Sequence, residues 1–68
     1  MSKNNTENLI NYLEKIGNSG LVKECAYSIG EQIFINIVHE NGRFECEQHY
    51  CDERIKSIYE FLTKMFVV

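Results

Sequence analysis

The stretch FECEQHYCDER, from Phe44 to Arg54, holds the densest group of side chains in this chain that could do chemistry. It combines two cysteines, one histidine and four acidic residues within eleven positions. Cysteine, histidine and carboxylate side chains bind zinc, and a cysteine beside a histidine can serve as a nucleophile. Whether they do so here depends on which secondary-structure elements position them.

A zinc site would draw on the ligand set Cys25, His39, Cys46, His49 and Cys51. The spacing Cys-x2-His-x-Cys matches no common zinc motif, and no Cys-x2-Cys pair is present. If residues 43–50 form a strand, Cys46 and His49 point to opposite faces of the sheet. Cys25 and Cys46 would share a face but lie two strand spacings apart, roughly 10 Å, beyond the ~7 Å limit for a disulfide. We therefore expect structural thiols, no metal and no cofactor.

A catalytic thiol is also disfavoured by the sequence. Cys51 lies just before a predicted helix, whose positive end favours a thiolate, but Asp52 and Glu53 oppose that effect. A pair with His49 would have no evident third member and no cleft for a substrate. His39 is expected to cover the rim of the core. We expect no catalytic residue, and hence a protein that is not an enzyme.

Length and composition indicate one folded domain, residues 1–68. The chain is 44% hydrophobic and 25% charged, which is typical of a globular domain. No stretch approaches the ~20 apolar residues of a membrane span, and no secretory signal is recognisable. Three cysteines are an odd number, which favours reduced thiols. We expect a cytoplasmic protein that has no membrane partner.

Two helices are predicted, over about residues 5–17 and 52–66. Asn4 or Thr6 should cap the first helix, and Gly17 should end it. Asp52 should cap the second. Apolar residues recur in each at the spacing of one helical face: Leu9, Tyr12, Leu13 and Ile16 in the first; Ile55, Ile58, Tyr59, Leu62, Met65 and Phe66 in the second.

Three strands are predicted between the helices, over about residues 21–29, 33–39 and 43–50. A type I′ turn at Asn41-Gly42 would set His39 opposite Phe44 and Ile37 opposite Cys46. A three-residue turn after Ile29 would align the apolar residues of the first two strands. One sheet face is then apolar, made of Leu21, Cys25, Tyr27, Ile29, Ile33, Ile35, Ile37, Phe44, Cys46 and Tyr50.

These elements predict an α+β fold with two layers in the order α-β-β-β-α. A three-stranded antiparallel meander would carry both helices on its apolar face. The other face, which includes Val22, would be mixed in character and in contact with water. Its third strand would be an edge strand showing Glu45 and Glu47 to solvent, as edge strands do to avoid pairing.

The charge is unevenly distributed along the chain. Residues 23–53 contain seven acidic and two basic residues, a local net charge of −5, whereas the whole chain has −3. Nucleic-acid binding normally needs basic surface, so direct contact with nucleic acid is not expected. The acidic residues instead suit a partner protein or ribonucleoprotein complex with a basic surface.

The order α-β-β-β-α resembles the double-stranded-RNA-binding domain. That family contacts phosphates through lysines at the start of its second helix, where this chain has CDERIK, Cys51 to Lys56. The resemblance therefore extends to the topology and not to RNA binding.

The layout of a capped helix, a meander with an Asn-Gly turn, a closing helix and acidic residues on the sheet also resembles small phage-encoded anti-CRISPR proteins. The resemblance covers nearly the whole chain and rests on no specific motif. It implies a phage or mobile-element inhibitor that blocks a CRISPR effector in the bacterial cytoplasm without catalysis. The partner-binding residues it implies are Glu40, Glu45, Glu47, Asp52 and Glu53.

A homodimeric regulatory or structural module is the alternative. Phe34 and Val38 are expected on the sheet face away from the helices, and Phe61 lies off the apolar stripe of the last helix. Exposed apolar side chains that cluster often mark an interface. These three residues are therefore the predicted dimer contacts.

Overall fold

A computed structural model describes residues 4–66. Its elements follow the predicted order: α1 (Asn5–Ser19), β1 (Val22–Ile29), β2 (Gln32–His39), β3 (Gly42–His49) and α2 (Asp52–Met65). The three strands form one antiparallel sheet in the order β1-β2-β3. The predicted α+β fold is therefore confirmed. Residues 1–3 and 67–68 of the expected single domain lie outside the described part.

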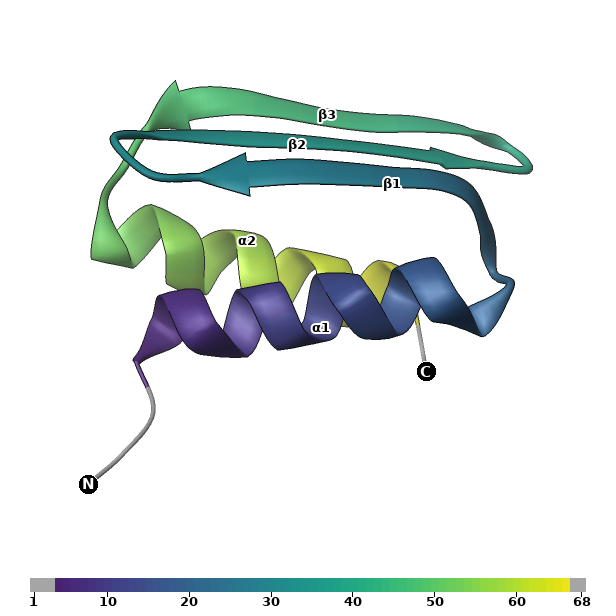
Figure 1. Ribbon diagram of the computed structural model, residues 1–68, viewed down its shortest axis with the longest axis horizontal. Coiled ribbons are helices and arrows are strands. Elements are labelled where there is room, and N and C mark those ends of the chain that lie inside the picture. Colours follow the sequence, from purple (N-terminus) through teal and green to yellow (C-terminus); the bar gives the residue numbers. More distant parts are fainter. Residues whose placement is uncertain (1–3, 67–68) are drawn as a thin grey trace.

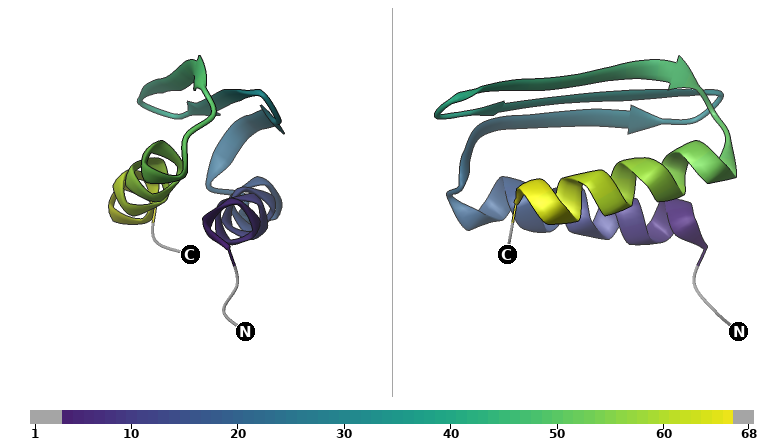
Figure 2. Two further views of the ribbon diagram at one scale, coloured as in Figure 1. Left: turned by 90° about the vertical axis from the view of Figure 1, so that its left-hand side faces the viewer. Right: turned by 180° about the vertical axis from the view of Figure 1, so that it is seen from behind.

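Both helices cover the same face of the sheet, as predicted (Figure 1). Seen from the end, α1 lies beneath β1, and α2 runs beside α1 toward the β3 side (Figure 2). The sheet therefore has one face turned toward the helices and one outer face with no described element over it. Antiparallel sheets tolerate this arrangement because the two faces of each strand alternate in character.

The core lies between the helices and the central strand. Burying a leucine or isoleucine side chain contributes about 1.5–3 kcal/mol. The buried side chains of the central strand and of the two helices therefore hold the layers together. No side chain that is polar or charged is buried within residues 4–66. The fully buried side chains are Leu9, Leu13 and Ile16 of α1, Ile33, Ile35 and Ile37 of β2, and Ile55 and Leu62 of α2.

Helix α1 is longer than predicted. Asn4 is its N-cap, with its side chain accepting a hydrogen bond from the backbone N–H of Glu7 at 2.7 Å. The helix passes through Gly17 and ends at Ser19, and its C-cap is Gly20, whose φ of 84° lies in the left-handed region. The prediction that Gly17 ends the helix was wrong because only Gly20 adopts the left-handed conformation that stops a helix.

Helix α2 begins differently from the prediction. Cys51 is its N-cap, with extended backbone and no capping hydrogen bond from its side chain, and Asp52 is the first helical residue. The Asp52 carboxylate accepts a hydrogen bond from the Tyr50 hydroxyl at 2.8 Å instead. The helix ends at Met65, one residue earlier than predicted, and Met65 is exposed while Phe66 is buried.

The hairpin of β1 and β2 has the predicted register. Ile37 lies opposite Cys25, and Ile33 lies opposite Ile29. A bulge between Val22 and Glu24 shifts the start of β1. Val22 consequently packs against the core and Leu21 is 48% exposed, the reverse of the predicted faces, because one extra residue moves the preceding side chains to the other side.

The hairpin of β2 and β3 is shifted by two residues from the predicted register. His39 lies opposite Gly42, and Ile35 lies opposite Cys46. The turn is centred on Glu40 and Asn41, and no non-glycine residue within 4–66 has a positive φ, so the predicted type I′ turn does not form. A two-residue shift keeps every side chain on its predicted face. It also leaves Tyr50 beyond the strand, where it is 41% exposed and not in the core.

Candidate partner-binding surface

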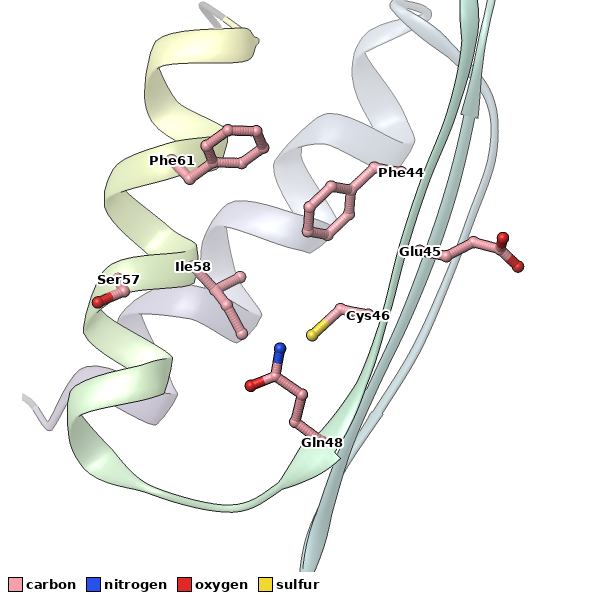
Figure 3. A pocket seen from close by; sticks show the side chains of 7 residues that line it. All are labelled: Phe44, Glu45, Cys46, Gln48, Ser57, Ile58 and Phe61. Carbon is pink, nitrogen blue, oxygen red and sulfur yellow. The ribbon is translucent and has the colours of Figure 1, made fainter.

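The outer face of β3 carries two of the predicted partner-binding acids. Glu45 lies opposite Asn36 and Glu47 lies opposite Phe34 of the central strand, and both glutamates are exposed. Figure 3 shows the Glu45 side chain pointing away from the helices. Arg43 lies 3.9 Å from Glu45, but both side chains are exposed, so the pair contributes little and leaves the acidic character of the strand intact.

The other three predicted acids lie at the two ends of this strand. Glu40 lies in the turn before β3, whereas Asp52 and Glu53 lie in the first turn of α2, after β3. All three are exposed. Because an eight-residue strand is about 25 Å long, the five acids do not form one cluster. They follow β3 from end to end, with Glu45 and Glu47 at its middle.

The free edge of β3 presents unpaired backbone groups, and the register identifies them. The N–H of Tyr50 donates to the carbonyl of Glu31 at 2.9 Å, which makes these two residues a hydrogen-bonded pair. Hydrogen-bonded pairs alternate along an antiparallel ladder, so Phe44, Cys46 and Gln48 direct their backbone groups toward β2. The N–H and C=O groups of the residues between them therefore point outward: Arg43, Glu45, Glu47 and His49.

An apolar groove of about 310 Å³ lies between β3 and α2. Phe44 and Cys46 point into it from the strand, and Ile58 and Phe61 line it from the helix (Figure 3). The rings of Phe44 and Phe61 are 5.7 Å apart, and Phe61 is 51% exposed. The groove is completed at its polar margins by Gln48, Ser57 and Glu45. Acidic side chains and an apolar groove thus flank the same edge strand.

The sequence did not reveal this groove. The sequence pattern predicts Phe44 in the core and Phe61 as a dimer contact, and it does not link the two residues. The sequence feature that could have indicated the groove is the position of Phe61, three residues after Ile58. This spacing places Phe61 on the side of the helix that turns toward the edge strand.

The three predicted dimer contacts do not form one surface. Phe34 is 46% exposed and Val38 is half-buried, and both lie on the outer face of β2. Phe61 lies in the groove on the other side of the sheet. Acidic residues also flank Phe34 and Val38, since Glu47 lies opposite the first and Glu24 opposite the second.

The cysteines lie where a reactive thiol would be poorly supported. Burial raises the pKa of the Cys25 and Cys46 thiols, and the charge of Arg54 offsets this only in part for Cys46. The Cys25 thiol donates to the carbonyl of Leu13 at 3.5 Å. Cys51 is half-buried at the start of α2. All three are free thiols, and within residues 4–66 no three Cys, His, Asp or Glu side chains converge as metal ligands.

The two histidines lie far apart in the register. The His39 ring packs edge-on against the buried Phe66 at 5.5 Å, which confirms its predicted place at the rim of the core. His39 lies opposite Gly42 and not opposite Phe44 as predicted. His49 is exposed at the end of β3, and its carbonyl accepts a hydrogen bond from Arg54 at 3.4 Å. Among residues 4–66, neither histidine side chain makes a hydrogen bond or an ion pair with a cysteine or a carboxylate.

No known protein family matches this chain, and no curated protein or solved structure matches it either. Neither α1 nor α2, the helices of the described residues, is long and apolar enough to span a bilayer. The function must therefore be inferred from the charges, the free edge and the groove.

Proposed function

We propose that this protein is a non-enzymatic inhibitor that docks the acidic strand β3 onto a basic surface of a host protein or ribonucleoprotein complex. The supporting observation is that Glu45 and Glu47 are exposed side by side on the outer face of an edge strand. The further acids at both ends of that strand extend the negative potential along its length. Complementary charge of this kind accelerates association and selects partners by sign.

The basic surface that best fits an acidic strand is one that normally binds nucleic acid. Such surfaces present several lysines and arginines toward phosphates, and an acidic protein that covers them excludes the nucleic acid. In keeping with the expected resemblance to anti-CRISPR proteins, the specific partner we propose is a CRISPR effector. The protein would then be encoded by a phage or another mobile element and act in the bacterial cytoplasm.

The test is inhibition of purified, guide-loaded CRISPR nucleases and surveillance complexes in a DNA-binding and cleavage assay. We expect the native chain to inhibit at least one of them at 150 mM salt. The double substitution Glu45→Lys, Glu47→Lys should weaken inhibition by at least about tenfold, because like charges across an interface are repulsive.

The matched control is Glu7→Lys, Glu60→Lys, which makes the same change in net charge on exposed positions of the helices. It should leave inhibition within about twofold of the native value, and circular dichroism should show that both variants fold. Equal loss in both variants would mean that only net charge matters. No loss in the β3 variant would refute the proposed surface.

A further inference from the structure

We propose that β3 binds an extended segment of its partner as a fourth, antiparallel strand, in which basic residues alternate with apolar ones. This inference rests on the proposed function for the basic character of the partner. It adds the mode of recognition and the sequence pattern that would be recognised. Three features of the structure support it: the free backbone edge, the faces of the β3 side chains and the groove beside α2.

The backbone of β3 is ready for strand addition. The outward N–H and C=O groups of Arg43, Glu45 and Glu47 have no hydrogen-bond partner among residues 4–66. A strand laid along this edge would bond to them in the alternating pattern of the existing ladders. Such main-chain hydrogen bonds provide affinity in strand addition, and the alternate side chains provide specificity.

The two faces of β3 determine why basic and apolar residues would alternate in the partner segment. Partner residues directly opposite Glu45 and Glu47 would lie on the outer face, where lysine or arginine pairs with the carboxylates. The partner residues between them would point to the other side, over the groove. There an apolar side chain would contact Phe44, Cys46 and Phe61 (Figure 3). The outer face therefore favours basic residues and the inner face favours apolar ones.

A second copy of this chain fits the edge less well. In an antiparallel pair centred on Cys46, Glu45 of each copy would face Glu47 of the other, and in one centred on Glu45 the two copies of Glu45 would face each other; like charges directly opposite are destabilising. A pair centred on Phe44 would oppose Arg43 and Glu45, but it would pair only residues 42–46. The acidic edge thus disfavours self-association and favours a basic segment.

The probe is a nonapeptide of alternating lysine and valine, acetylated and amidated, that begins and ends with lysine. In antiparallel addition, the peptide lysines opposite Glu45 and Glu47 direct their N–H groups to β3, and the valines direct theirs to solvent. N-methylation of the lysine backbone nitrogens should weaken binding by at least about tenfold, since a methyl group removes the donor and blocks the edge. N-methylation of the valine nitrogens should weaken it by less than about threefold.

These two peptides have the same charge and differ in composition by a single methyl group, since the probe has five lysines and four valines, so a large difference between their affinities reports backbone pairing. Equal affinity of both N-methylated peptides and the unmodified probe would refute strand addition. Selective loss on valine methylation would refute the antiparallel orientation. A native chain that is dimeric by sedimentation at the concentrations used, with its edge amides protected from hydrogen exchange, would show that a second copy occupies β3 and would also refute the proposal.

Substitutions in β3 itself also test the proposed backbone pairing. Glu47→Pro removes an outward N–H that makes no bond to β2, a position where an edge strand tolerates proline. Glu47→Gln is its matched control, because it removes the charge and keeps the N–H. We expect Glu47→Gln to weaken peptide binding about two- to fivefold and Glu47→Pro to weaken it at least about fivefold more.

Phe61→Ala tests the groove and should weaken binding of the valine-containing probe by about fivefold or more. A peptide with serine in place of valine should lose this sensitivity. If Phe61→Ala has no effect on the valine probe, the apolar residues do not enter the groove and the proposal fails.

The same variants separate this inference from the proposed function. If Glu45→Lys, Glu47→Lys abolishes inhibition of the effector while Glu47→Pro inhibits as well as Glu47→Gln, the acidic surface binds without strand addition. If the lysine–valine probe binds in the predicted manner but no effector is inhibited, strand addition stands and the proposed inhibitor function fails.

Discussion

The two edges of the sheet are built from strands of equal length, but they differ in how the helices cover them. On the β1 side, the Tyr27 hydroxyl donates to Glu14 at 3.2 Å, and the Cys25 thiol donates to the carbonyl of Leu13. A Cβ placed on Gly17 would lie 3.6 Å from that of Cys25. On the β3 side, α2 leaves a groove, and the ring contact of Phe44 with Phe61 crosses it.

This difference shows how a small domain can divide stability and recognition between its halves. Helix α1 lies directly on β1, and hydrogen bonds from Tyr27 and Cys25 join the two elements. The β3 side places a short cysteine side chain and a polar Gln48 opposite α2, so the layers do not close there. The half with fewer contacts is also the half with the acids, and it is the half to which we assign binding.

The largest expected effect comes from truncating one apolar side chain in each half. Leu13→Ala on the β1 side removes a fully buried side chain and should lower the free energy of unfolding by about 2–5 kcal/mol. Phe61→Ala on the β3 side truncates a half-exposed ring and should cost less than about 1 kcal/mol. Urea titrations followed by circular dichroism measure both values.

Since domains of this size rarely have more than about 3–5 kcal/mol of stability, Leu13→Ala should unfold at a much lower urea concentration than the native chain. If it unfolds at the same urea concentration as Phe61→Ala, the two halves are equally important for stability. The division proposed above would then be wrong.

Much of the fold could be predicted because the spacing of apolar residues along a helix and their alternation along a strand determine which faces are buried. The apolar stripe of α1 and the alternation of Ile33, Ile35 and Ile37 identify the buried faces, and the register of β1 with β2 follows from matching those faces. The errors arose at element ends. There, a single backbone choice, such as the bulge at Val22 or the left-handed φ at Gly20, decides the outcome and leaves no periodic signal.

The candidate surface was predicted only in part. The exposure of Glu45 and Glu47 follows from strand alternation, and the structure bears it out. The groove depends on the distance between α2 and β3, which is set by the sizes of side chains from both elements at once. Residues such as Phe44 and Phe61 are separated in sequence, and no local pattern states that they approach each other.

A second prediction concerns Tyr12, which joins the two halves. Its hydroxyl lies within hydrogen-bonding distance of the carbonyls of Leu62 and Phe66 at the end of α2, 2.9 Å from the first. Tyr12→Phe should lower the free energy of unfolding by about 0.5–1.5 kcal/mol at pH 7, as expected for one lost hydrogen bond. Urea titration measures this loss.

The alkaline pH dependence identifies the same contact. Burial, with a smaller contribution from Tyr59, raises the pKa of Tyr12 above its ordinary value of 10.0. The folded state thus holds this proton more tightly than the unfolded state, so the stabilisation is complete below pH 10 and is lost as pH rises beyond it. Tyr12→Phe should therefore lose less stability than the native chain above pH 10. If the free energies of unfolding of the two proteins fall equally as pH rises above 10, Tyr12 is not the group responsible for the loss.

The smallest expected effect concerns the first turns of the two helices. Asn4 caps α1 with its side chain, whereas Cys51 occupies the equivalent position of α2 with suitable extended backbone and no capping bond. Asn4→Ala should cost about 1 kcal/mol. Cys51→Ser, which supplies a hydroxyl acceptor of similar size, should add about 0.5 kcal/mol.

Thermal unfolding of both variants at pH 7 measures these opposite changes. Cys51→Ala is the control, since it removes the thiol without adding an acceptor. If Cys51→Ser raises the unfolding temperature and Cys51→Ala does not, the first turn of α2 lacks the side-chain cap that the first turn of α1 has. Equal stability of the serine and alanine variants would show that the first turn of α2 is already satisfied by water or by Asp52, and that the halves differ only in their packing.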